Sequence, residues 1–169
     1  GNYTGTVRDA NNCTATVSFT IGSPATFTAT ATGQDISCFG LTDGQITASA
    51  TPNGTYEYSI DGTTFQSANT FTGLAAGNYT VTVRDGNQCT STATVTIAEP
   101  TAVTTNLVAT DASGAGATDG SIDATVSGGT PNYSFSWSNG PVTEDISNLA
   151  PGVYILTVTD DNGCEVADT

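Results

Sequence analysis

The sequence predicts an all-β protein made of tandem β-sandwich repeats of about 75 residues, and three observations lead to this prediction. Apolar residues alternate with threonine and serine along most of the chain, which is the pattern of half-buried strands. Glycine, at 19 of the 169 residues, interrupts every stretch that could form a long amphipathic helix. The third observation is that one sequence pattern returns along the chain, as tandem repeats do.

The recurring pattern begins at Gly1 as GNYTGTVRDANNCTATVSFTI and at Gly77 as GNYTVTVRDGNQCTSTATVTI. A related segment, PGVYILTVTDDNGCEVADT, begins at Pro151 and places Gly152 where the earlier glycines stand. The spacing is 77 − 1 = 76 residues for the first interval and 152 − 77 = 75 for the second. We therefore expect residues 1–22 to be the C-terminal hairpin of a preceding repeat, residues 23–99 a complete repeat, and residues 100–169 a second repeat whose last strand is truncated.

Period-two alternation places the strands inside the 23–99 repeat, here lettered A to G. Strands A to C are expected at 26–32, 45–51 and 55–60, one or two short edge strands within 63–73, and strands F and G at 78–84 and 90–97. Alternation on strand C turns aromatic side chains inward in both repeats. The predicted core aromatics are Tyr56, Tyr58, Tyr133, Phe135 and Trp137. A sandwich core needs such residues, so we interpret them as core rather than as a carbohydrate-binding surface.

A second local pattern, L-x-x-G-x-Y, occurs just before strand F in both repeats and ends at Tyr79 and at Tyr154. Immunoglobulin and fibronectin type III folds place a tyrosine corner at this point, where the hydroxyl ties the E–F turn to nearby backbone. The pattern therefore predicts immunoglobulin-like sandwiches.

Three segments resemble a known family: Cys38-Phe-Gly-Leu-Thr-Asp-Gly, the run from Gly128-Gly-Thr-Pro to Trp137-Ser-Asn-Gly140, and Leu149-Ala-Pro-Gly-Val-Tyr with Asp161-Asn-Gly-Cys164. They look like SprB-type repeats, which occur in very large surface adhesins of gliding and other Bacteroidota and are similar to PKD-like sandwich modules. The resemblance implies an extracellular location on the bacterial outer surface, type IX secretion, and a role in filaments, attachment or motility. Gly114 departs from the family where it expects its first cysteine, and Asn53-Gly54 replaces its Gly-Gly-x-Pro turn.

The four cysteines suit an oxidising compartment, although their number does not fix their connectivity. Cys13, Cys89 and Cys164 are equivalent F–G loop positions, whereas Cys38 lies between strands A and B. Those two loops lie at opposite poles of a sandwich, roughly 20 Å apart, whereas a disulfide needs Cα atoms within about 7 Å. Because the bottom of one repeat meets the top of the next, we expect a Cys38–Cys164 bond between repeats. Cys89 and Cys13 would then pair with A–B cysteines of upstream repeats.

Two other cysteine arrangements stay open from the sequence alone. Slippage in the strand placement would allow a Cys38–Cys89 bond within one repeat, which leaves Cys164 without a partner because Gly114 stands at the matching position. Alternatively, the cysteines are unpaired buried thiols.

Charge and composition exclude several functions. The chain has 16 acidic residues, 2 arginines and no histidine, for a net charge of −14. Without a basic patch it is not expected to bind nucleic acid or anionic lipid, and no apolar run is long enough for direct membrane insertion. No histidine or lysine is present to act as a base at neutral pH, so we expect no enzyme. No cofactor is expected, except that Asp160 and Asp161 are candidate calcium ligands in an acidic loop.

Two functions remain after these exclusions. The repeats form a structural stalk or filament whose partners are neighbouring repeats or copies of the same protein, or they are themselves an adhesive surface that binds polysaccharide or a partner protein. Near-identical repeats without a long, aromatic-rich insertion favour the stalk or filament.

Overall fold

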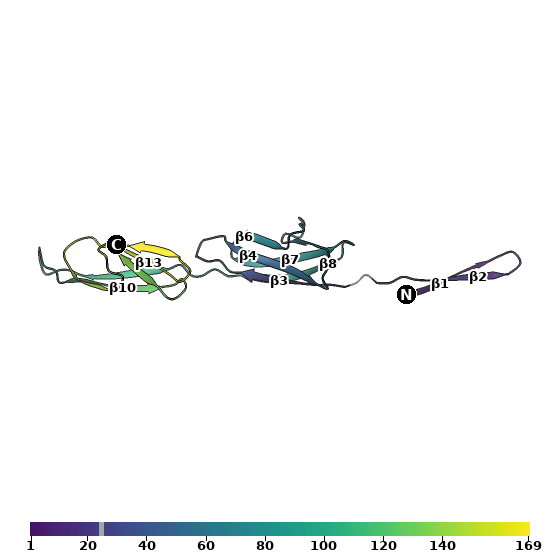
Figure 1. The fold of residues 1–169 in the computed structure, drawn as a ribbon, viewed down its shortest axis with the longest axis horizontal. Helices are drawn as coiled ribbons and strands as arrows, with labels where there is room; N and C mark the ends of the chain where they lie inside the picture. The colour runs from purple at the N-terminus through teal and green to yellow at the C-terminus, as the bar shows by residue number, and fades with distance from the viewer. Residues whose placement is uncertain (24–25) are drawn as a thin grey trace.

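The computed structural model describes residues 1–23 and 26–169 and confirms the all-β prediction. This part of the chain contains fourteen strands and no helix, and so no helix that could span a membrane. Figure 1 shows a two-stranded hairpin followed by two β-sandwiches, arranged in a row along the long axis of the molecule.

Each repeat is a pair of three-stranded antiparallel sheets packed face to face. In the 23–99 repeat the sheets have the orders β3-β4-β6 and β5-β7-β8, and in the 100–169 repeat β9-β10-β12 and β11-β13-β14. The strands of the first are β3 Thr28–Gln34, β4 Gly44–Thr51, β5 Tyr56–Ser59, β6 Thr70–Leu74, β7 Gly77–Asp85 and β8 Thr90–Ile97. Those of the second are β9 Thr104–Thr110, β10 Gly120–Ser127, β11 Ser134–Trp137, β12 Ile146–Leu149, β13 Leu156–Thr159 and β14 Glu165–Asp168.

The repeats have six strands each, which fits the expected strands A, B, C, F and G with a single short edge strand between C and F. The segment 60–69 returns from the end of β5 to the start of β6 without forming a strand, and its only ladder contact is an isolated bridge between Gln66 and Tyr58. The Asp61-Gly62 turn, with a positive φ of 74° at the glycine, starts this return. Because the segment still crosses the length of the sandwich, the A–B and F–G loops lie at opposite poles as in a seven-stranded fold.

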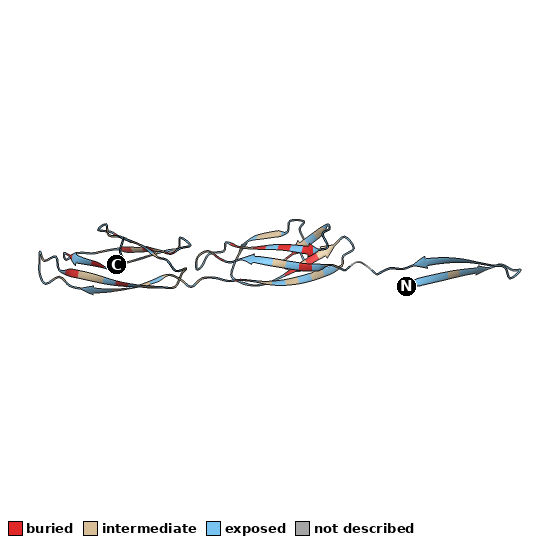
Figure 2. Cartoon of the chain, turned by 60° about the horizontal axis from the view of Figure 1, so that its bottom comes forward, coloured by how far each residue is buried: buried red, intermediate tan, exposed pale blue. Residues whose placement is uncertain are grey.

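Each repeat has its own hydrophobic core, formed by the inner faces of its two sheets (Figure 2). The fully buried residues of the first core include Ile46, Val81 and Val83. In the second core the single tryptophan, Trp137, is buried and donates its indole N–H to the carbonyl of Thr143 at 3.0 Å. The other four predicted core aromatics are half-buried and pack against these clusters: Tyr56, Tyr58, Tyr133 and Phe135.

The residues of the L-x-x-G-x-Y pattern make the same contact in both repeats. The hydroxyl of Tyr79 donates to the carbonyl of Ala75, and that of Tyr154 to the carbonyl of Ala150, each at 2.8 Å. In each sandwich the tyrosine side chain is therefore hydrogen-bonded to the backbone of the E–F turn, four residues earlier in the chain. This is the geometry of a tyrosine corner.

The N-terminal hairpin pairs β1 (Asn2–Arg8) with β2 (Thr14–Thr20) and has no core of its own. Tyr3 and Phe19 stack with ring centroids 5.8 Å apart, yet each is 50% exposed. The equivalent residues of the 23–99 repeat, Tyr79 and Val95, pack against its core. A hairpin alone is marginally stable in water, so we expect this face to pack against at least one further strand.

Candidate functional site

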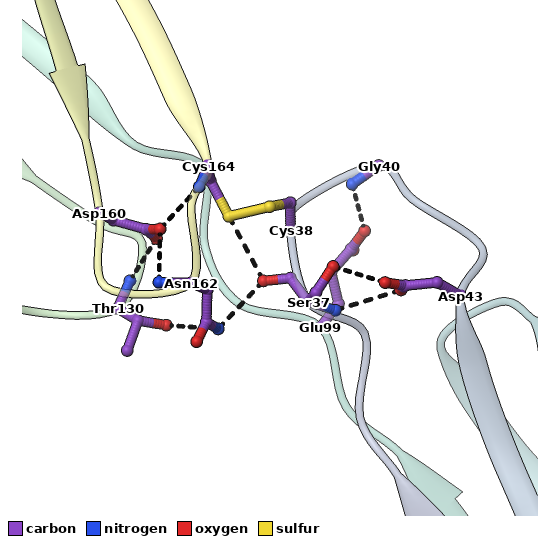
Figure 3. The surroundings of a disulfide bond; sticks show 9 residues. All are labelled: Ser37, Cys38, Gly40, Asp43, Glu99, Thr130, Asp160, Asn162 and Cys164. Carbon is purple, nitrogen blue, oxygen red and sulfur yellow. Dashed lines mark hydrogen bonds between the residues drawn. A yellow bond between two sulfur atoms is a disulfide. The ribbon is translucent and has the colours of Figure 1, made fainter.

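The contact between the two repeats is centred on a disulfide that joins Cys38 to Cys164, with Cα atoms 5.6 Å apart (Figure 3). Cys38 lies in the loop between β3 and β4, and Cys164 in the turn between β13 and β14. Cys89 and Cys13 are free thiols, so the Cys38–Cys89 alternative does not form. The bond closes a loop of 126 positions in the sequence and encloses most of both sandwiches.

Strand direction explains why these two cysteines meet. In Figure 1, β3 runs away from the N-terminal hairpin, so the loop after it lies at the pole that faces the next repeat. β13 and β14 are antiparallel, and the turn between them lies at the pole of the 100–169 repeat that faces back. The end-to-end arrangement of the sandwiches therefore places an A–B loop against an F–G turn.

The buried carboxylate of Asp160 holds the β13–β14 turn in shape. Its Oδ1 accepts the amide N–H groups of Asn162 at 2.9 Å and Cys164 at 2.8 Å, and its Oδ2 accepts that of Thr130 at 2.8 Å. Burial raises the pKa of this carboxyl, but the amide donors outweigh burial and hold the pKa below its ordinary value. The ionised carboxylate fixes the backbone that presents Cys164.

A second carboxylate, Asp43, holds the opposite loop. It accepts the hydroxyl of Ser37 and, at 3.1 Å, the backbone N–H of Ser37. The hydroxyl, followed by the backbone N–H, lowers the pKa of Asp43. Glu99, in the linker between the repeats, accepts the N–H of Gly40 at 2.7 Å and so ties the loop to the linker.

Polar contacts accompany the disulfide across the junction. The side-chain amide of Asn162 donates to the carbonyl of Ser37 at 3.1 Å and to the hydroxyl of Thr130 at 2.9 Å. Sγ of Cys164 lies 3.3 Å from the same Ser37 carbonyl, a close contact without a proton because the sulfur is in a disulfide. The junction thus combines one covalent bond with one hydrogen bond from a neighbouring side chain.

The linker also packs on the Gly128-Gly129 turn of the 100–169 repeat. Gly129 donates its N–H to the carbonyl of Thr101 at 2.8 Å. Gly128 has a φ of +79°, and a Cβ on it would overlap the carbonyl of Ala102. Both the backbone conformation and the close approach require glycine here, so this turn fixes the linker to the second sandwich.

Sequence reasoning selected both cysteines but missed Asn162, Ser37, Glu99 and the role of the Gly-Gly turn. A signal for Asn162 is present in the sequence, since asparagine stands two residues before the cysteine in all three F–G turns, at Asn11, Asn87 and Asn162. The contacts of Ser37 and Glu99 depend on how the repeats meet, which no local pattern reports.

The two candidate calcium ligands, Asp160 and Asp161, lie next to each other in the turn between β13 and β14. The oxygens of Asp160 are directed at amide donors, and the side chain of Asp161 is exposed beside it. Across residues 1–23 and 26–169, no group of three or more His, Cys, Asp or Glu residues is arranged to hold a metal ion.

Comparison with known families agrees with this architecture. The SprB repeat family matches residues 30–65 and 106–142, in each case the part from strand A to just beyond strand C. No curated protein matches the chain. SprB repeats are structural rather than enzymatic and are associated with cell-surface proteins. The resemblance in the sequence is thereby confirmed: two segments of the chain, one in each repeat, match the SprB repeat.

Proposed function

We propose that these repeats form the shaft of an extracellular stalk or filament used in attachment or gliding. The observation that carries this proposal is the Cys38–Cys164 bond, which joins neighbouring repeats rather than closing one of them. A bond of this kind restricts rotation at the linker, because the repeats are then joined at two points. A shaft needs such stiffness, whereas independently hinged binding modules do not.

The path of tension through the chain supports a mechanical role. Tension entering at Thr28 runs along β3 to Cys38, crosses the disulfide to Cys164 and leaves along β14. Both strands point along the long axis, in the same direction (Figure 1). Residues between the two cysteines lie outside this covalent path, so pulling on the ends does not stretch them.

Surface charge and the exposed hairpin suit an extended assembly. A net charge of −14 favours an extended array over a collapsed one, because like charges repel along its length. The apolar face of β1 and β2 is the part of the chain that we expect to contact a neighbouring repeat or another copy of the protein.

A second candidate function, an adhesive surface, is favoured by one observation. A cavity of about 360 Å³ lies at the junction beside Phe39 and Leu41, whose side chains are 59% and 47% exposed. Exposed apolar groups next to a cavity are suited to contact a protein or a sugar face. An adhesive surface does not explain the disulfide between the repeats, whereas a mechanical shaft does, so we place the shaft first.

Small-angle X-ray scattering of the Cys38→Ser variant tests the shaft. Without the bond we expect a broader distribution of maximum dimensions than in the unaltered chain, because the linker alone then sets the angle between repeats. Cys89→Ser is the matched control, since it removes a free thiol from the same chain, and it should scatter like the unaltered protein. Equal distributions for all three proteins would contradict the shaft and place the adhesive function first.

A further inference from the structure

We propose that Asn87 with Cys89, and Asn11 with Cys13, are open half-sites that form a disulfide with the A–B loop of another repeat, a loop of the Ser37-Cys38 type. The inference rests on the proposed function, because it extends the observed junction to both ends of each repeat. The partner is thus a further copy of this repeat. Its A–B loop would supply a cysteine for the disulfide and, from the serine before it, a backbone carbonyl for the hydrogen bond.

The three F–G turns have the same backbone contacts. In each, the Oδ1 of an aspartate accepts the N–H of the cysteine four residues later: Asp9 to Cys13 at 2.8 Å, Asp85 to Cys89 at 2.9 Å and Asp160 to Cys164 at 2.8 Å. In each, the aspartate N–H donates to the carbonyl of that cysteine at 3.0 Å. The residue before the cysteine has a positive φ in all three, at Asn12, Gln88 and Gly163. All three cysteines are therefore presented in one way, and one of them is bonded to Cys38.

The asparagine supplies a second, independent point of contact. In the bonded turn, the amide of Asn162 donates to the carbonyl of Ser37, the residue before Cys38. Asn87 and Asn11 occupy the same place in the open turns, and both are exposed. Each open turn thus has the same two groups as the bonded turn: a cysteine that can form the disulfide and an asparagine amide that can donate the hydrogen bond.

The A–B loop of the 100–169 repeat has the same backbone conformation as the loop that carries Cys38. In the 100–169 repeat, Ser113 donates its N–H to Asp119 at 2.9 Å, as Ser37 does to Asp43 at 3.1 Å. The turns that follow match too, with Leu41 N–H bonded to the Cys38 carbonyl at 3.1 Å and Ala117 N–H to the Gly114 carbonyl at 3.0 Å. The loop keeps its shape without a cysteine, so Cys38 is an addition to the loop for bonding and not a requirement of its fold.

The linker lengths allow the same junction on the other side of the 23–99 repeat. From Ile97 to Thr104 the count is 104 − 97 = 7 positions, and from Ile21 to Thr28 it is 28 − 21 = 7. A repeat placed ahead of Thr28 at this spacing brings its A–B loop to the pole where Cys89 lies.

The bond forms by thiol–disulfide exchange with a small disulfide such as oxidised glutathione. The two cysteine thiols lose two protons and two electrons and become one disulfide, while the oxidant is reduced to two thiols. The thiolate of one cysteine first forms a mixed disulfide with the oxidant, and the second thiolate then displaces the reduced half.

The test is a longer chain in which a second copy of residues 24–99 is inserted after Glu99, which preserves the seven-position linker. An exposed Thr92→Ser change marks the downstream copy by mass. After equilibration in a glutathione redox buffer, we expect non-reducing peptide mapping to find Cys38 of the upstream copy bonded to the marked Cys89, with Cys38 of the downstream copy bonded to Cys164. Cys13 and the upstream Cys89 should remain free.

Two variants of the longer chain separate the outcomes. Cys38→Ser in the upstream copy should leave the marked Cys89 free, and Asn87→Ala in the downstream copy should lower the equilibrium constant for the new bond by about fivefold, the effect of one hydrogen bond. A marked Cys89 that stays free while the Cys38–Cys164 bond forms would overturn the half-sites and leave the shaft intact. Absence of both bonds would count against the shaft itself.

Discussion

Stretched from its two ends, the oxidised chain should reach a contour length about 440 Å shorter than the reduced chain. The difference is the 126 positions between Cys38 and Cys164 at roughly 3.5 Å per residue. With the disulfide intact, force can detach β3 and β14 but cannot extend the enclosed residues. After reduction, each sandwich unfolds separately because each has its own core, so two steps should appear. Single-molecule force spectroscopy measures both quantities.

The controls for this experiment lie in the same chain. Cys38→Ser should give the long contour under oxidising conditions, whereas Cys89→Ser should keep the short one. The β1–β2 hairpin opens equally in every case and cancels from the difference. Equal contour lengths for the oxidised and reduced chains would show that the bond does not shield the sandwiches from tension.

The second large effect concerns Asp160. Replacing it with asparagine should lower the free energy of unfolding of the 100–169 repeat by about 2 kcal/mol, because hydrogen bonds to an ionised acceptor contribute more than those to a neutral one. The asparagine would also direct an NH2 group at one of the amide donors that the carboxylate now accepts. Urea denaturation followed by the fluorescence of Trp137, the only tryptophan, reports on this repeat alone.

Asp161→Asn is the matched control, since this neighbour is exposed and should change the stability little. Acid gives a second readout. The pKa of Asp160 is lowered in the folded state, so its contribution is present above the ordinary carboxyl pKa of about 4 and is lost as the pH falls through the folded value. When the pH is lowered from about 5 to about 2, the free energy of unfolding of the Asp160→Asn repeat should therefore fall by less than that of the unaltered repeat. Equal acid sensitivity would contradict this role.

Much of the fold follows from local pattern. Alternation located the strands to within a few residues, and the L-x-x-G-x-Y pattern indicated the turns that Tyr79 and Tyr154 close. Whether residues 63–73 form one edge strand or two was not predictable in this way, because their polar and aromatic residues suit an edge strand as well as an irregular return. Whether such a segment pairs depends on the sheet edge beside it.

The junction shows a different limit of sequence reasoning. Loop polarity and repeat spacing were enough to suggest Cys38 and Cys164 as partners, since they depend only on strand order. The contacts of Ser37, Glu99 and Gly128 depend on the distance and angle between two folded sandwiches. Asp160 was selected for its charge as a candidate calcium ligand, whereas its burial and its hold on the backbone of the β13–β14 turn were not indicated by the sequence.

Non-reducing peptide mapping of the native protein tests the central claim most directly. The account predicts a peptide pair linked through Cys38 and Cys164, which reduction separates, with Cys89 outside that bond. A pair linked through Cys38 and Cys89, or Cys38 and Cys164 both recovered as free thiols, would contradict a covalent junction between the repeats.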